Sequence, residues 1–223
     1  MSGKIEVSEK AIQILPSGVA GDLVIPVSAR SVIVFAHGSG SSRLSSRNRF
    51  VAGVLQEARF TTLLLDLLTG EEEQIDIRTQ QFRFDINLLA NRLVEATEWL
   101  ADNAETSGLP VGYFGASTGA AAALIAAAQL PEVIGAVVSR GGRPDLAGTA
   151  LLQVKAPTLL IVGGHDRAVI ELNETAWNKL QCEKKFGVVP GATHLFEEPG
   201  ALEQVATMAS NWFKDHLQQG RSS

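Results

Sequence analysis

The residues best suited to chemistry are Gly115-Ala116-Ser117-Thr118-Gly119, which follow an apolar run, 111–114, and precede an Ala-rich stretch, 120–130. The pattern predicts a strand, a sharp turn and a helix. A serine at the tip of such a turn is held clear of the backbone, and flanking glycines let strand and helix approach closely. A plain turn with a helix-capping serine has a similar composition. The interpretation of Ser117 as a nucleophile therefore depends on whether a base, an acid and an oxyanion site occur elsewhere.

Three further loops carry those groups, each directly after a predicted strand. Asp166 and His194 follow two strands in the second half of the chain, and His37-Gly38-Ser39-Gly40 follows one in the first half. Ligands of open α/β sheets bind outside the carboxyl ends of the strands. The chain order Ser, Asp, His is that of the catalytic triad found in α/β hydrolases, and differs from the orders in chymotrypsin-like and subtilisin-like folds. The agreement of order and placement favours the nucleophile interpretation over the capping serine.

Each of these groups has a chemical role in such a triad. His194 would take the proton of Ser117 as the hydroxyl attacks a carbonyl, and would later protonate the leaving group. Asp166 would fix the tautomer of the imidazole and stabilise the imidazolium. A tetrahedral oxyanion needs preorganised donors, for which we predict the backbone N–H groups of Ser39 and Thr118. His37, beside the predicted oxyanion loop, is expected to be structural rather than catalytic.

Alternating strand and helix patterns must position these loops. Apolar runs predict strands at 4–8, 18–27, 31–36, 61–66, 110–114, 133–139, 157–162 and 184–189. Helical periodicity predicts helices at 47–57, 80–103, 120–130, 145–152, 169–179 and 201–217, whereas 68–78 is acidic and is expected to be irregular. The first two strands are predicted to form an antiparallel edge pair through Pro16-Ser17-Gly18. The sequence thus predicts one α/β domain, 1–223, with a doubly wound, mostly parallel sheet, helices on both faces and no lid domain.

Composition excludes several classes of partner. The net charge of −5 argues against a nucleic-acid-binding face, and a single cysteine, Cys182, cannot form an intramolecular disulfide. The most apolar stretch, 119–130, is too short to span a bilayer, and the first residues lack the apolar core of a signal peptide. We therefore predict a cytoplasmic protein with no membrane or nucleic-acid partner. Its oligomeric state is left open.

Metal and nucleotide sites are not indicated by the motifs. The four histidines show no metal-ligand spacing, so no metal is predicted. Gly38-Ser39-Gly40 would need a third glycine where Arg43 stands to complete a dinucleotide-binding loop, and no Walker loop occurs. We predict no cofactor.

Several arginines are expected near the rim of the site despite the acidic net charge. Arg43, Arg47 and Arg49 follow the predicted oxyanion loop, and Arg140 and Arg143 follow the strand 133–139. Our hypothesis is that Arg140, Arg143 and Arg43 bind a carboxylate or phosphate of the substrate. The alternative is that these arginines are solvated or pair with the acidic segment 71–73.

These motifs together resemble the dienelactone hydrolase-like branch of the α/β-hydrolase superfamily. The resemblance rests on His37-Gly38-Ser39-Gly40, the Ser117 motif, Gly163-Gly164-His165-Asp166 and the segment 191–200, and it covers nearly the whole chain. The segment 191–200 is also similar to hydrolase domains fused to phosphoribosyltransferases. Dienelactone hydrolase has cysteine where this chain has Ser117, so the resemblance implies a serine hydrolase acting on ester, thioester or lactone bonds of a small molecule, possibly an anionic one.

Two other interpretations stay open at this point. A binding or regulatory protein could keep the hydrolase fold without turnover, and acyl transfer to an acceptor other than water would use the same groups. The acyl group and the leaving group of the substrate are not specified by the sequence.

Overall fold

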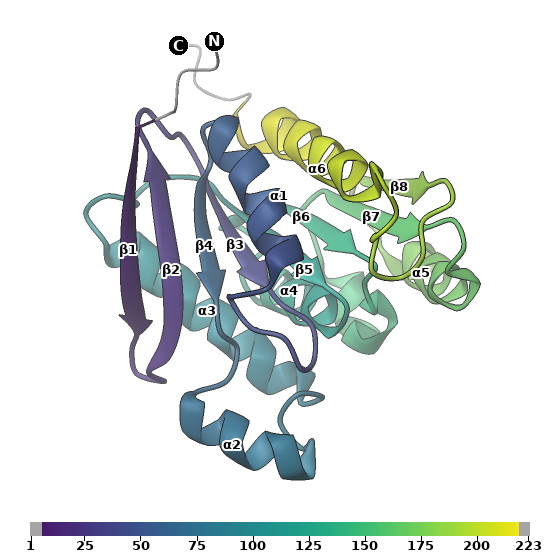
Figure 1. Cartoon of the computed structure of the whole chain (residues 1–223), viewed down its shortest axis with the longest axis horizontal. Helices are drawn as coiled ribbons and strands as arrows, with labels where there is room; N and C mark the ends of the chain where they lie inside the picture. Colours follow the sequence, from purple (N-terminus) through teal and green to yellow (C-terminus); the bar gives the residue numbers. More distant parts are fainter. Residues whose placement is uncertain (1–5, 219–223) are drawn as a thin grey trace.

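Eight strands form one sheet in the order β1-β2-β4-β3-β5-β6-β7-β8 (Figure 1). The structure, a computed structural model, describes residues 6–218. The strands are β1 (Val7–Ile14), β2 (Val19–Pro26), β3 (Val32–Ala36), β4 (Thr61–Leu65), β5 (Val111–Ala116), β6 (Ile134–Arg140), β7 (Thr158–Gly163) and β8 (Lys184–Val189). All pairs from β4 to β8 are parallel, whereas β2 pairs antiparallel with both β1 and β4. This confirms the predicted doubly wound, mostly parallel sheet with an antiparallel edge pair.

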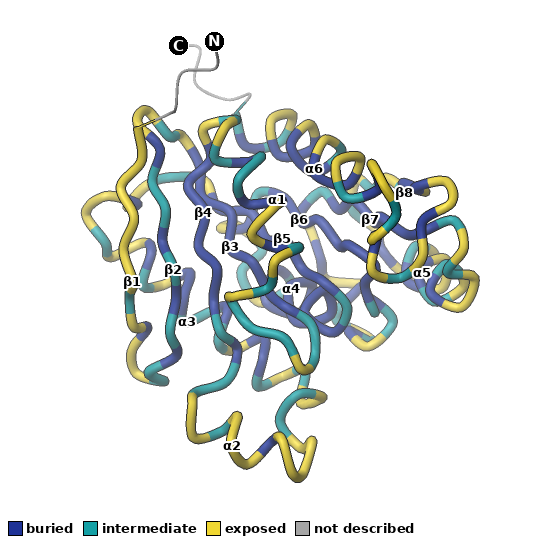
Figure 2. Tube along the Cα trace, viewed as in Figure 1, coloured by how far each residue is buried: buried dark blue, intermediate teal, exposed yellow. Residues whose placement is uncertain are grey.

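Helices cover both faces of the sheet, as predicted (Figure 1). They are α1 (Ser46–Glu57), α2 (Gly70–Thr79), α3 (Ile86–Asp102), α4 (Thr118–Gln129), α5 (Arg167–Lys179) and α6 (Ala201–Leu217), with a 3₁₀ segment, η1 (Pro144–Leu152). Two separate apolar clusters form the core: α1 and α6 pack on one face, and α3, α4, α5 and η1 on the other. The central strands are dark blue in Figure 2, which shows that they are buried on both faces. Continuous apolar runs such as 32–36 are the sequence signature of such strands.

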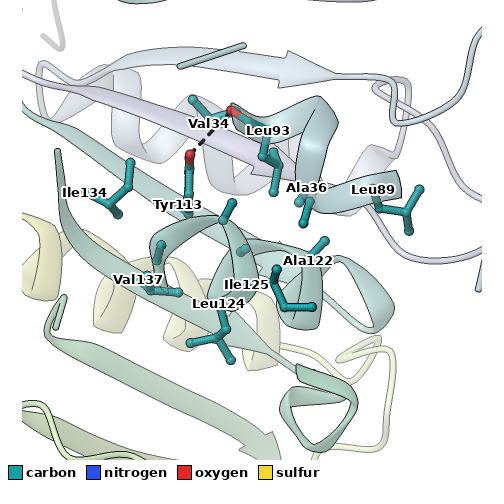
Figure 3. Close-up of a cluster of buried hydrophobic side chains, with 14 of the residues drawn as sticks. Val34, Ala36, Leu89, Leu93, Tyr113, Ala122, Leu124, Ile125, Ile134 and Val137 are labelled. Atoms are coloured by element: carbon teal, nitrogen blue, oxygen red, sulfur yellow. Dashed lines mark hydrogen bonds between the residues drawn. The ribbon is translucent and has the colours of Figure 1, made fainter. Parts of the chain in front are cut away.

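The core behind the site is built from small and branched side chains around Tyr113 (Figure 3). The first ten residues of α4 are all buried, and their alanines let the helix lie close to α3, η1 and the sheet. The buried Tyr113 hydroxyl lies 2.6 Å from Thr97 Oγ1 and donates to the Leu93 carbonyl at 3.4 Å. A buried hydroxyl without a partner would destabilise the fold, so this pairing allows tyrosine in an otherwise apolar cluster.

Strand register brings the ends of the central strands to one edge. Ala36 of β3 pairs with Gly115 of β5, and Ala116 pairs with Arg140 of β6. The chain leaves β3 for β4 on one side and returns through α3 to β5 on the other, so the order reverses between β3 and β5. Such a reversal opens a crevice at the carboxyl edge of a parallel sheet. The loops that follow these strands therefore meet there.

Three predicted elements differ from the structure. The acidic segment that was expected to be irregular forms α2, because Thr69 and Glu72 make a reciprocal capping box at its start. The helix predicted at 80–103 begins only at Ile86, after Asp85 caps it and Gln80 adopts a left-handed conformation. The first strand runs from Val7 to Ile14 instead of 4–8, the first two residues of which lie outside the described part.

The chain between β6 and β7 holds only short loops and η1, so no lid domain is inserted there, and the elements of residues 6–218 form the lidless fold that was predicted. Helix α2 projects from the body of the molecule and is exposed along most of its length (Figures 1 and 2). Within residues 6–218, we find no helix with the length and apolar character needed to cross a membrane.

Candidate active site

Ser117 stands at a sharp turn between β5 and α4 with φ 51° and ψ −123°. A positive φ costs a non-glycine residue free energy and is concentrated at functional sites. The glycines on either side are required by space: a Cβ at Gly119 would lie 2.3 Å from the Ala36 carbonyl oxygen, and one at Gly115 would lie 2.4 Å from Ala120 Cα. Although Ser117 is the N-cap residue of α4, its side chain makes no capping hydrogen bond. The hydroxyl therefore stays available for other chemistry.

Asp166 and His194 come from the neighbouring loops after β7 and β8. Asp166 Oδ2 lies 2.7 Å from His194 Nδ1. Asp166 occupies the N-cap position of α5, yet its side chain makes no capping bond and is directed to the histidine instead. The two loops are packed backbone to backbone, because the His165 N–H donates to the Ala192 carbonyl at 2.9 Å. Since Nδ1–H donates to the carboxylate, Nε2 is left as a proton acceptor.

A small cavity joins Ser117 to His194. Both residues line this catalytic cavity, whose volume is about 160 Å³, together with parts of the loop after β3 and of the first turn of α1. No hydrogen bond links the Ser117 hydroxyl to the His194 ring within residues 6–218. Hydrogen bonds between catalytic groups often tighten only when substrate is bound, so this arrangement is compatible with proton transfer.

The two predicted oxyanion donors differ in their surroundings. The Thr118 N–H is at the first position of α4, where backbone donors have no partner inside the helix. The Ser39 N–H, by contrast, donates to Thr118 Oγ1 at 3.0 Å, and the two hydroxyls lie 2.9 Å apart. Ser39 can therefore contribute only by sharing this hydrogen or by releasing Thr118. The contact between the two hydroxyls had no signal in the sequence, because the residues are 79 positions apart.

Two of the predicted anion-binding arginines are engaged elsewhere. Arg43 forms ion pairs with Asp22 and Asp66, and Arg143 forms two hydrogen bonds with Asp145, at 2.9 and 2.8 Å. Neither arginine lines the catalytic cavity. We therefore correct the prediction for both: their charges are neutralised by carboxylates of the protein. These are not the acidic residues 71–73 that the alternative interpretation named.

Arg140 is the third predicted arginine, and it does line the catalytic cavity. Its side chain is buried, with 7% of the residue exposed, and its carbon Cζ lies 5.9 Å from the centre of the Phe196 ring. Its guanidinium donates to Asn48 Oδ1 at 3.4 Å, while its Nε has no partner among the described residues. Burial, and next the charge of Arg47, lowers the pKa of Arg140 to about 10. A buried cation without a carboxylate partner is costly, and here it stands beside Ser117.

Arg47 is the residue that our choice of arginines missed. It lines the same cavity from the first turn of α1, and its Nη1 lies 3.1 Å from Glu197 Oε1. Its Nε is buried without a hydrogen-bond partner in the described part of the chain, like that of Arg140. The buried guanidinium of Arg140 gives the cavity positive charge, and Arg47 adds hydrogen-bond donors although its own charge is paired with Glu197. Its proximity to the predicted oxyanion loop was the only signal in the sequence, and Arg43 shared it.

His37 is a structural residue in this arrangement. Its Nε2 accepts the Leu67 N–H at 3.1 Å and its Nδ1–H donates to the Gly38 carbonyl at 2.9 Å, so the ring links the loops after β3 and β4. Both nitrogens are thus used by the neutral tautomer. Burial lowers the pKa of His37 below its ordinary value of 6.5.

We expect the free energy of unfolding to fall as the pH is lowered from 6.5, because the unfolded chain then binds a proton at His37 that the folded chain resists. The slope from one such group is at most about 1.4 kcal/mol per pH unit. Urea denaturation at a series of pH values below 7 measures it. His37→Gln should remove this component, whereas His165→Gln, at an exposed histidine, should retain it. An unchanged slope in His37→Gln would contradict the assignment.

Metal ligands are not gathered anywhere in the described residues: no group of three or more His, Cys, Asp or Glu side chains is placed to hold an ion.

The family of this chain follows from its similarity to known proteins. The model of the dienelactone hydrolase family matches residues 19–218. This chain belongs to the dienelactone hydrolase family. Dienelactone hydrolase of Anabaena variabilis is 58% identical in sequence to this chain, and the match covers 96% of this chain and 99% of the Anabaena chain. Its crystal structure superimposes on this structure with a TM-score of 0.92. Est1E of Butyrivibrio proteoclasticus, 15% identical over 94% of this family member and 99% of its own chain, has a TM-score of 0.76 and shows the shared fold alone.

The curated relative in Mycobacterium tuberculosis carries the name "Putative phosphoribosyl transferase". It is 61% identical to this family member over 202 residues, which are 91% of this chain and 45% of that protein. The chain thus spans about half the length of the curated relatives that it matches. Membership of the dienelactone hydrolase family supports a hydrolase function for the matched region.

Proposed function

We propose that this family member is a serine hydrolase that cleaves carboxylic ester bonds, or related thioester or lactone bonds, in a small substrate. The observation that carries the proposal is the 2.7 Å contact between Asp166 and His194, at a cavity that Ser117 lines from a strained turn. Nucleophile, base and orienting acid are thereby supplied by three loops at one edge of the sheet.

The reaction follows from the proton positions. As Ser117 Oγ bonds to the carbonyl carbon, its proton passes to His194 Nε2, and Asp166 stabilises the resulting imidazolium. Collapse of the tetrahedral intermediate breaks the bond to the leaving group, which takes that proton and leaves an acyl group on Ser117. A water molecule then attacks the acyl carbon, again giving its proton to His194, and the acid is released as Ser117 regains its proton. The Thr118 N–H, with Ser39 as the second donor, would stabilise the oxyanion.

Positive charge in the catalytic cavity favours an anionic substrate. Arg140 is buried beside Arg47, and neither Nε has a partner in the described part of the chain. A carboxylate or phosphate would neutralise this charge and offer acceptors that fit guanidinium geometry. We therefore propose a small ester that carries an anionic group as the substrate.

Labelling with a fluorophosphonate probe tests the proposed nucleophile. We expect intact mass to show one adduct on the wild type and none on Ser117→Ala, because the probe reacts with activated serines. Circular dichroism would establish that the variant is folded. A folded wild type that stays unlabelled near pH 8 would instead favour a ligand-binding or regulatory protein that retains the hydrolase fold.

A further inference from the structure

A second and larger cleft lies beside the catalytic cavity. Its volume is about 340 Å³, compared with about 160 Å³ at Ser117. It is bounded by the loop after β3, the loop after β4 and the inner side of α2, the helix that projects from the body in Figure 1. Pockets for small ligands usually exceed 300 Å³. The cavity at Ser117 is too small for that class, so a substrate of ordinary size must extend beyond it.

The wall between the two spaces is thin. Gly38, Ser39 and Ser41 line both of them. Gly38 lies against the nucleophile: a Cβ there would be 2.9 Å from Ser117 Cβ. Because this wall carries only glycine and serine, a chain that starts at Ser117 can pass over it into the cleft.

The roof of the cleft is fixed to the predicted oxyanion loop. Ser39 Oγ donates to the Arg83 carbonyl at 3.2 Å. The segment around Arg83 is held in turn by the buried Asp76, which accepts the N–H groups of Phe82 and Arg83 at 2.8 and 3.0 Å and Arg83 Nε at 2.6 Å. A polar network of this kind holds the cleft open in the absence of ligand.

Proton transfer decides which part of an ester would face the cleft. The leaving group receives its proton from His194, so it must lie on the side of Ser117 where His194 stands. His194, Arg140 and Arg47 all line the catalytic cavity, and none of them lines the cleft. The leaving group and the anion therefore belong on that side, and the acyl group points across the wall.

The lining of the cleft differs in charge from the catalytic cavity. Leu67, Leu68 and Ile77 contribute apolar surface, and the carboxylates of Asp66 and Asp76 are neutralised by arginines. Glu73 also lines the cleft, and no ion pair of this residue occurs within residues 6–218. Such a lining accepts an apolar chain, favours a cationic end and disfavours an anionic one.

We propose that this cleft is the acyl subsite, and that it takes a medium-length apolar acyl chain with an uncharged or cationic end, while the anionic part of the substrate stays with Arg140 and Arg47. The inference rests on the proposed serine hydrolase activity, and it adds the substrate class: esters with an anionic leaving group and a non-anionic acyl group.

Three esters with the same leaving group test the proposal: para-nitrophenyl acetate, the para-nitrophenyl ester of gamma-butyrobetaine, and its isosteric analogue in which a tert-butyl group replaces trimethylammonium. We expect kcat/KM for the para-nitrophenyl ester with the tert-butyl-ended acyl chain to exceed that for para-nitrophenyl acetate by about tenfold, because the methylene groups of the longer chain are buried in the cleft. Ile77→Trp, which adds bulk at the cleft, should bring this ratio to about one. Leu152→Trp, at an exposed leucine of η1 outside the cleft, should keep it.

Charge is tested separately with the two long esters. Glu73→Gln should lower the preference for the cationic over the neutral ester by about threefold, a modest effect because the carboxylate is exposed. Glu71→Gln, on the same helix but outside the cleft, should leave it unchanged. A wild type without preference for the longer acyl chains, or a preference that Ile77→Trp leaves intact, would overturn the proposal.

Binding distinguishes failure of the subsite from failure of the hydrolase proposal. The free acid with the tert-butyl-ended chain should bind the Ser117→Ala variant, as measured by NMR chemical-shift changes. This binding should be lost when Ile77→Trp is added to that variant. If no ester is cleaved but this binding pattern holds, the cleft is a ligand site and the hydrolase proposal fails. If esters are cleaved and the acid does not bind, the acyl subsite is overturned.

Discussion

Replacing Asp166 by asparagine is expected to lower kcat for ester hydrolysis by about 10⁴. The carboxylate accepts the Nδ1–H of His194 at 2.7 Å. An amide in its place can donate to Nδ1, which moves the imidazole proton to Nε2 and removes the acceptor that Ser117 needs. The neutral amide also fails to stabilise the imidazolium. Steady-state kinetics with para-nitrophenyl acetate would measure the loss.

The matched control for this change is Asp145→Asn. Asp145 is also a half-buried aspartate with a side-chain partner, but its partner is Arg143 and it does not line the catalytic cavity. We expect its kcat to stay within about twofold of the wild type, as is usual for substitutions away from such features. An Asp166→Asn variant that retained more than a tenth of wild-type kcat would contradict the assignment of Asp166 as the orienting acid.

Replacing Arg140 by methionine is expected to change binding and stability in opposite directions. Loss of the buried guanidinium should lower kcat/KM for an anionic ester by about 100-fold, the effect of one buried charged hydrogen-bonding partner. The same change should raise the free energy of unfolding by about 2 kcal/mol, because methionine has a similar volume and no charge to desolvate. The lowered pKa of Arg140, about 10, has the matching sign: the folded state disfavours the charged form at neutral pH.

Selectivity is measured with a matched pair of substrates, para-acetoxybenzoate and its methyl ester, which differ in one negative charge on the leaving group. Arg140→Met should act on the first far more than on the second, and urea denaturation would follow stability. Arg143→Met is the control, because its guanidinium is bound to Asp145 outside the cavity. Equal losses of kcat/KM for the two substrates would contradict the role of Arg140 in binding the anion. A lower free energy of unfolding for Arg140→Met would contradict the expectation that the buried guanidinium destabilises the fold.

Three features that conflict with local stability meet at the catalytic cavity, although positive φ angles and buried polar atoms without a partner also occur at other positions within residues 6–218. Ser117 has a positive φ, and Arg140 and Arg47 have buried donors without a partner in the described part of the chain. Other buried polar groups, among them His37 and Thr97, are satisfied by their neighbours. Local conflicts that the rest of the fold supports are typical of functional sites.

The regular elements that the sequence predicted well have strong, uninterrupted patterns. The final helix, 201–217, and the last strand, 184–189, have the predicted bounds, and the buried strand 32–36 was recognised from its continuous apolar run. Helix α2 was missed because its charge and low apolar content suggested a loop, although Thr69-x-x-Glu72 was a capping signal. The exposed edge strand β1 was cut short because its alternating polar residues resemble a loop.

The sequence by itself determined the order and placement of Ser117, Asp166 and His194, because each directly follows a strand and parallel strands end at one edge of the sheet. Their catalytic roles stay predictions. Only the tertiary structure decided which arginine reaches the cavity. Arg43 is neutralised by a carboxylate of β2 and by that of the residue after β4. No local sequence pattern shows that these segments lie close to Arg43 in space. The occupied N–H of Ser39 and the cleft beneath α2 were hidden for the same reason: each depends on contacts between loops that are far apart in the chain.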